Sequence, residues 1–93
     1  MKDEIKNLCR LAYTVKEKRH RVLKAVEEMA ELQKELIKNI NSGKDNVDKI
    51  IDEVADVYIT LEYVKIYYGI DKEIDTQIEM KIKKFIEKQG LNL

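Results

Sequence analysis

Two stretches that echo each other decide the fold of this 93-residue chain: Val22-Leu-Lys-Ala-Val-Glu-Glu-Met-Ala-Glu-Leu32 and Val47-Asp-Lys-Ile-Ile-Asp-Glu-Val-Ala-Asp-Val57. When they are aligned, Val, Lys, Glu and Ala recur at 22/47, 24/49, 28/53 and 30/55, and acidic residues recur at 27/52 and 31/56. Apolar residues return every three or four positions in both stretches, which is the period of an amphipathic α-helix. The alignment therefore predicts two neighbouring helices that present the same acidic face.

The rest of the chain contains few residues that interrupt helices, with no Pro and only three Gly. Because strong helix formers such as Leu, Glu and Lys are abundant, the composition favours an all-α protein. The periodicity and its interruptions predict four helices: the first from about Asp3 to the region of Thr14, the second along 22–40, the third along 47–68 and the fourth along 71–89.

Particular residues predict where these helices begin and end. Gly43, Gly69 and Gly90 follow the last apolar positions of the second, third and fourth helices, as C-terminal caps do. Asp45 and Asp71 are the expected N-terminal caps of the third and fourth helices. The first break lies between 13 and 20, where the sequence is compatible with a capping box of Thr14 and Glu17 or with a polar loop.

Short connections between four helices predict an antiparallel four-helix bundle-like arrangement in a single domain, residues 1–93. The third helix has an unusually wide apolar surface, because Ile59, Tyr63, Ile66 and Tyr67 extend its apolar stripe. One small bundle is not expected to cover that surface. We therefore expect the protein to form a homo-oligomer through helix three.

The charge balance excludes some partners. Lys and Arg together number 18, as do Asp and Glu, so no basic surface predicts nucleic-acid binding. No apolar run approaches the length of a membrane span, and the sequence begins with charged residues, so we expect a cytoplasmic protein. The single cysteine, Cys9, lies between apolar residues and is expected to be a core residue.

The acidic faces of the second and third helices predict a metal centre. If these helices pack antiparallel, Glu28 and Glu31 come to face Glu53 and Asp56, because residues three apart lie on one side of a helix. Four carboxylates at close range repel one another unless a cation lies between them, and Mg²⁺ or Mn²⁺ prefers such oxygen ligands. No Cys or His on these faces favours Zn²⁺, since His20 is the only histidine.

A simpler interpretation is that the acidic residues are solvated at the edge of the apolar stripes. Glu28 and Glu53 lie on that edge, and Glu31 and Asp56 lie roughly opposite it at 100° per residue. Because charged residues in such places are usually exposed, the pattern alone leaves the metal centre and the solvated face as equal alternatives.

The two motifs resemble those of a known enzyme family. Glu27-Glu28-Met-Ala-Glu31 and Glu53-Val-Ala-Asp56 are similar to the paired EExxE and ExxD motifs of the MazG-like nucleoside triphosphate pyrophosphohydrolases. The resemblance runs from about 20 to 88. It implies an all-α, Mg²⁺-dependent hydrolase, active as a homodimer or homotetramer, that converts nucleoside or deoxynucleoside triphosphates to monophosphate and pyrophosphate.

The same resemblance implies roles for individual residues. Glu28, Glu31, Glu53 and Asp56 would be the catalytic metal ligands, with Mn²⁺ as a possible substitute for Mg²⁺. Lys81 and Lys84 occupy the stretch in which the family binds the substrate phosphates, although Lys84 replaces an expected Arg. His20 occupies a position where related short proteins contact the nucleotide, and a solvated histidine is the alternative.

Two other functions compete with this one. Phosphoribosyl-ATP pyrophosphohydrolase has the same fold and also places a Lys, here Lys24, three residues before its paired glutamates, but Val57-Tyr58-Ile59 departs from its usual Tyr-His. The other candidate is a non-catalytic helical interaction module that binds a partner through the Tyr-rich third helix. Metal dependence separates the enzymes from the interaction module.

Overall fold

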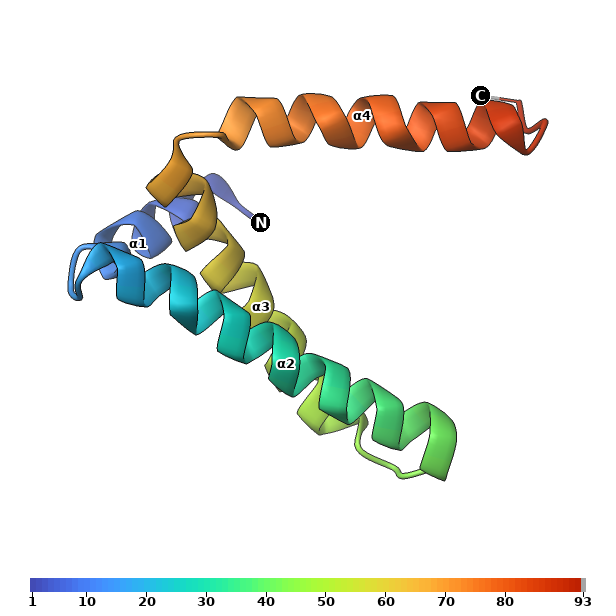
Figure 1. Ribbon diagram of the computed structural model, residues 1–93, viewed down its shortest axis with the longest axis horizontal. Coiled ribbons are helices and arrows are strands. Elements are labelled where there is room, and N and C mark those ends of the chain that lie inside the picture. Colours follow the sequence, from blue (N-terminus) through green and yellow to red (C-terminus); the bar gives the residue numbers. More distant parts are fainter. Residues whose placement is uncertain (93) are drawn as a thin grey trace.

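The interruptions in the hydrophobic pattern become the turns between four α-helices in a computed structural model, which describes residues 1–92 (Figure 1). The helices are α1 (Asp3–Tyr13), α2 (Lys18–Ser42), α3 (Val47–Tyr68) and α4 (Asp71–Lys88). No strand forms within the described residues. The predicted all-α class is therefore confirmed.

Glycine ends the second and third helices as expected. Gly43 and Gly69 adopt the left-handed conformation, with φ of 64° and 65°, which a residue with a side chain adopts only with strain. The Gly69 N–H donates to the carbonyl oxygen of Lys65 at 2.9 Å, and the Ile70 N–H donates to the same oxygen at 3.2 Å. These bonds satisfy a carbonyl that the end of α3 would otherwise leave unpaired.

The N-terminal caps predicted for the third and fourth helices are wrong, and of the two alternatives for the first break the Thr14–Glu17 capping box does not form. Glu17 caps α2, since its carboxylate accepts the N–H groups of Arg19 at 3.0 Å and His20 at 3.1 Å. Thr14 instead ends α1 and donates its hydroxyl to the Leu11 carbonyl at 2.7 Å. The caps of α3 and α4 are Asn46 and Ile70, neither of which makes a side-chain capping bond, so Asp45 and Asp71 do not cap these helices.

Asn46 is drawn into the contact between α2 and α3, which explains why it does not cap α3. Its buried amide Nδ2 donates to the Glu35 carbonyl oxygen and to Glu35 Oε1, both at 3.0 Å. Asn39 donates to Asn46 Oδ1 at 3.1 Å. This network joins the end of α2 to the start of α3, and the two long helices lie side by side as an antiparallel pair (Figure 1).

The aromatic core lies where α1 packs against α3. Cys9, Tyr13 and Tyr63 are buried together, and the two tyrosine rings lie 6.0 Å apart. Ile66 packs against the same cluster. Cys9 is thus a core residue as expected, whereas Tyr63 and Ile66 are partly or wholly covered by α1 and widen the exposed surface of α3 less than the sequence predicts.

Helix α4 extends away from the other three and leaves a wide concave space between itself and the α2–α3 pair (Figure 1). None of its residues is buried, and the apolar side chains of Ile78, Ile82 and Phe85 are more than half exposed. The helix is amphipathic, and among residues 1–92 only the start of its stripe has a partner, where Ile74 and Ile78 line a hollow together with Met1, Tyr58 and Leu61. The described residues of one chain therefore do not close into a four-helix bundle.

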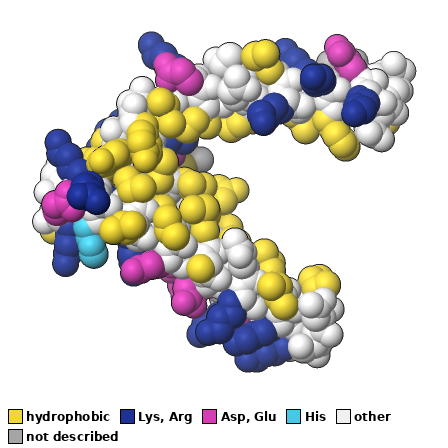
Figure 2. All heavy atoms as spheres, in the orientation of Figure 1, with side chains coloured by type: hydrophobic (Ala, Val, Ile, Leu, Met, Phe, Trp, Pro, Cys, Tyr) yellow, Lys and Arg dark blue, Asp and Glu magenta, His cyan; other side chains and the backbone are white. Residues whose placement is uncertain are grey.

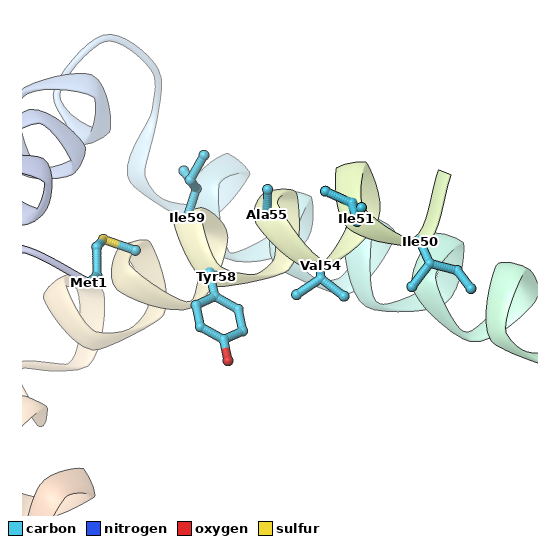
Figure 3. Close-up of a pocket in the computed structure, with 7 residues that line it drawn as sticks. All are labelled: Met1, Ile50, Ile51, Val54, Ala55, Tyr58 and Ile59. Carbon is cyan, nitrogen blue, oxygen red and sulfur yellow. The ribbon is translucent and has the colours of Figure 1, made fainter. Parts of the chain in front are cut away.

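The concave side of the molecule is rich in exposed apolar side chains (Figure 2). An open apolar hollow of about 460 Å³ runs along α3 (Figure 3) and is lined by Met1, Ile50, Ile51, Val54, Ala55, Tyr58 and Ile59. Within residues 1–92, no helix has the length and apolar character needed to cross a membrane.

Candidate metal centre

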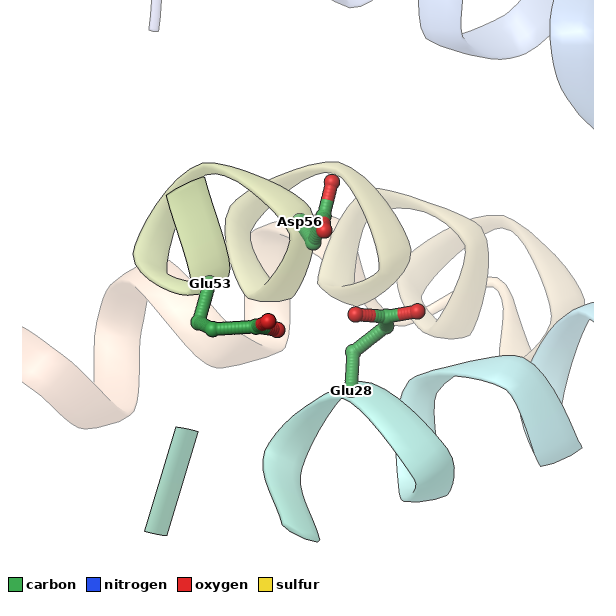
Figure 4. Close-up of side chains that lie close together, drawn as sticks. All are labelled: Glu28, Glu53 and Asp56. Atoms are coloured by element: carbon green, nitrogen blue, oxygen red, sulfur yellow. The ribbon is translucent and has the colours of Figure 1, made fainter. Parts of the chain in front are cut away.

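Three of the predicted ligands meet between the two long helices. Glu28 comes from α2 and points toward α3, which carries Glu53 and Asp56 (Figure 4). Each residue offers a carboxylate oxygen, and these oxygens all lie within 4.8 Å of one another. The antiparallel pairing of α2 and α3 brings the echoed motifs face to face, which is why residues 25 or more positions apart in the sequence share one site.

Burial and mutual repulsion make this cluster unfavourable when all three groups are ionised. Glu53 is 7% exposed, and its pKa is raised first by burial and then by the charges of Glu28 and Asp56. Burial likewise raises the pKa of half-buried Asp56, with a further contribution from the charge of Glu28. A cation would relieve both effects, since it favours the ionised carboxylates.

A buried carboxylate oxygen lacks a partner at the centre of the cluster. Glu53 Oε2 makes no hydrogen bond within the described residues. Buried polar atoms are nearly always hydrogen-bonded, so such an oxygen calls for an explanation. The donor set consists of carboxylates alone, which suits a hard divalent cation such as Mg²⁺ or Mn²⁺. The residues therefore fit the metal that the sequence predicts.

Lys24 partly neutralises the cluster from one side. Its ammonium lies 3.2 Å from Glu28 Oε1 and 3.3 Å from Glu27 Oε2, one turn along α2. These contacts raise the pKa of Lys24, with Glu28 contributing most, so the ammonium stays protonated. One cation thus serves two glutamates, and neither Glu53 nor Asp56 forms an ion pair among residues 1–92.

A small cavity of about 170 Å³ adjoins the carboxylates. Glu28 and Asp56 form one part of its wall, and the remaining lining comes from Arg21, Lys24, Ile59, Thr60 and Tyr63. Basic and acidic side chains thus line one cavity. Thr60 helps to shape the wall, since its hydroxyl is turned back to donate to the Asp56 carbonyl at 3.0 Å.

Arg21 is positioned by both neighbouring helices. Its Nη2 donates to the Ala12 carbonyl at 2.6 Å, and its guanidinium carbon lies 5.0 Å from the centre of the Tyr63 ring. The second contact has the geometry of a cation–π interaction. Its Nε is buried and has no hydrogen-bond partner within residues 1–92.

The structure does not bring the fourth predicted ligand into the cluster. Glu31 is exposed and lies outside the group formed by Glu28, Glu53 and Asp56. On α3 the same three-residue spacing does keep Asp56 with Glu53, so the spacing predicted from the sequence brings together the pair on α3 but not the pair on α2. Its charge still contributes to the raised pKa of Glu53. A ligand role for Glu31 stays a prediction.

The other predicted site residues lie apart from the cavity in one chain. Lys81 and Lys84 are exposed on α4, which extends away from α2 and α3 (Figure 1). His20 is exposed in the first turn of α2, where its N–H donates to the capping Glu17 carboxylate. Phosphate binding by the lysines and nucleotide contact by His20 therefore stay predictions.

Sequence reasoning missed Arg21 and Tyr63 as parts of the site. The helical period was the available signal for Arg21, because this residue lies on α2 seven residues, or two helical turns, before Glu28. Tyr63 likewise follows Asp56 by seven residues on α3. Both residues line the same cavity as the carboxylates of their helices. Their burial depends on α1, whose position the periodicity did not predict.

Comparison with known proteins adds no assignment. The chain matches no protein-family model, no curated protein and no solved structure.

Proposed function

We propose that the protein is a Mg²⁺-dependent nucleoside or deoxynucleoside triphosphate pyrophosphohydrolase that releases monophosphate and pyrophosphate. The observation that carries the proposal is the meeting of Glu28, Glu53 and Asp56 from two helices, with the buried Oε2 of Glu53 left without a partner. The resemblance of the two acidic motifs to those of the MazG-like enzymes supports the same assignment.

Each carboxylate has a distinct part in this proposal. Glu53, the most buried, and Asp56 from α3 would hold the cation together with Glu28 from α2. Bound Mg²⁺ would supply charge for the phosphate oxygens and acidify a water molecule for attack on the α-phosphorus. Exposed Glu31, or exposed Glu27 on release from its ion pair with Lys24, would orient that water or accept its proton.

The active form in this proposal is a homodimer or homotetramer. The supporting observation is the exposed apolar surface of α3 and α4, which includes Ile51 at 63% and Ile82 at 52% exposure. A second copy would remove this surface from water, which stabilises the assembly in proportion to the apolar area covered. Such an assembly is also a way in which α4 could complete a bundle.

The apolar hollow on α3 favours a second candidate, a non-catalytic helical module that binds another protein. Exposed apolar hollows with an aromatic side chain, here Tyr58, are typical of protein interfaces. Such a module would not require the carboxylate cluster. Binding of Mg²⁺ and release of pyrophosphate both separate it from the enzyme.

The test is a panel of four ribonucleoside and four deoxyribonucleoside triphosphates, each incubated with the protein and Mg²⁺ and assayed for pyrophosphate. We expect release from at least one of them, and chelation of Mg²⁺ by EDTA should abolish it. Failure on every nucleotide, combined with no measurable binding of Mn²⁺, would favour the interaction module.

A further inference from the structure

Arg21 is the one residue of the cavity wall whose positive charge has no acidic partner. It forms no ion pair among residues 1–92, although Glu28 and Asp56 line the same cavity. The Ala12 carbonyl takes a hydrogen bond from Nη2, and the guanidinium carbon lies 5.0 Å from the centre of the Tyr63 ring. Since a guanidinium has five N–H donors, most of its capacity is uncommitted.

Lys24 brings a second cation to the same cavity from the next turn of α2. Its ammonium has three donors, and the contacts with Glu27 and Glu28 use two of them. The side chain is 46% exposed, so it can turn between the glutamates and a ligand in the cavity. Arg21 and Lys24 therefore form a pair of cations, one fixed and one adjustable.

The size and charge of the cavity indicate the class of ligand. A volume of about 170 Å³ is well below the roughly 300–1,000 Å³ of pockets that enclose a drug-sized molecule. It suits a phosphate group better than a whole nucleotide. An arginine fixed by its neighbours is well suited to phosphate, because its planar fork donates two parallel hydrogen bonds.

We infer that Arg21 and Lys24 form the subsite for the phosphate groups released as pyrophosphate, an inference that rests on the proposed function. The nearby carboxylates repel an anion until a divalent cation neutralises them, so the subsite binds pyrophosphate only when the metal is present. The base and sugar of the nucleotide lie outside this cavity. Lys81 and Lys84 on α4 then contribute less than Arg21 and Lys24.

The probe is inorganic pyrophosphate, titrated into the full chain by calorimetry with and without Mg²⁺. We expect Arg21→Gln and Lys24→Gln each to weaken Mg²⁺-dependent binding at least about 10-fold, the loss typical of a hydrogen bond between charged groups. Lys34→Gln is the matched control, since it removes an exposed lysine from the same helix, and it should bind within about two-fold of wild type by the same scale.

Electron paramagnetic resonance measures the binding of Mn²⁺. This measurement separates the inference from the proposed function on which it rests. The inference predicts that both variants still bind Mn²⁺. It is overturned if wild type releases pyrophosphate from a nucleotide but Lys24→Gln binds pyrophosphate as wild type does, or if only Lys81→Gln and Lys84→Gln weaken binding. The absence of Mn²⁺ binding and of pyrophosphate release in wild type would overturn the proposed function as well.

Arg21→Gln also removes a contact with α1, so its helical content must be checked by circular dichroism. Lys24 makes no contact with α1 or α3 in the hydrogen bonds and ion pairs of residues 1–92 and provides the variant that is safe for folding. If Arg21→Gln unfolds, the result for Lys24→Gln alone decides the inference.

Discussion

The ammonium of Lys24 lies 3.2 Å from Oε1 of Glu28, and Glu28 is the only member of the three-carboxylate cluster that is ion-paired within residues 1–92. Glu53 and Asp56 face it across the α2–α3 interface without a cation of their own. The cluster is therefore incompletely neutralised by the protein.

Neutralising Asp56 should separate metal binding from folding. In Asp56→Asn the shape of the side chain is kept and the repulsion between Asp56 and both Glu28 and Glu53 is relieved, so the metal-free protein should melt at the same temperature as wild type or higher. Mg²⁺ should raise the melting temperature of wild type by mass action and that of the variant much less. Differential scanning calorimetry with EDTA or Mg²⁺ measures both effects.

Asp52→Asn is the control for this experiment. Asp52 is exposed and outside the cluster, although its charge contributes to the raised pKa of Asp56. It should keep the full stabilisation by Mg²⁺. Equal stabilisation of wild type and Asp56→Asn would mean that Asp56 is not a ligand.

The Glu35–Asn46 contact should make stability depend on pH. Hydrogen bonding from Asn46 lowers the pKa of Glu35, with Lys38 and Lys49 contributing through their charges. The contribution of this contact to the free energy of unfolding is therefore fully present above the ordinary pKa of a glutamate. It is lost as pH falls through the lowered pKa of Glu35 in the folded state. The part of wild-type stability that this contact supplies should decline in that acidic range, which is opposite in sign to the effect of the raised pKa values of Glu53 and Asp56.

Asn46→Ala tests this contact, because it removes the donor from the buried Glu35 carboxylate and carbonyl. The melting temperature at pH 7 should fall by roughly 5 °C or more, as expected when buried groups lose their partner. The difference in unfolding free energy between variant and wild type should shrink at acidic pH, which urea titrations followed by circular dichroism would measure. A difference independent of pH would contradict the assignment of the pKa shift to Asn46.

The exposed apolar surface of α3 predicts self-association. Light scattering should give at least a dimer at micromolar concentration. Ile51→Lys should shift the protein toward monomer without loss of helicity, because it places a charge in the apolar hollow. Asp48→Lys, a lysine at an exposed polar position of the same helix, should leave the assembly intact. A wild-type monomer would refute association through α3.

The sequence contained the information for the helices and for the convergence of three carboxylates, because both depend on local periodicity and on a short turn at Gly43. It identified the C-terminal caps Gly43 and Gly69 but not the N-terminal caps, since candidate polar residues lie next to one another and tertiary contacts choose among them. At the start of α3, for example, Asn46 takes the cap position in place of Asp45, and its amide donates to the Glu35 carboxylate of α2. An amphipathic pattern also does not show which surface covers the apolar side of a helix. The separation of α4 from the other three helices was therefore not predictable.

The central proposal is cleavage between the α- and β-phosphates by the carboxylate site. The most direct measurement is ³¹P nuclear magnetic resonance of the products formed in ¹⁸O-labelled water from the nucleotide that the panel identifies, with wild type and Asp56→Asn compared. We predict monophosphate carrying one ¹⁸O together with unlabelled pyrophosphate, and at least about 100-fold slower turnover in the variant, given what loss of a group at a metal site commonly costs. Release of orthophosphate with diphosphate, or undiminished turnover in Asp56→Asn, would contradict the account.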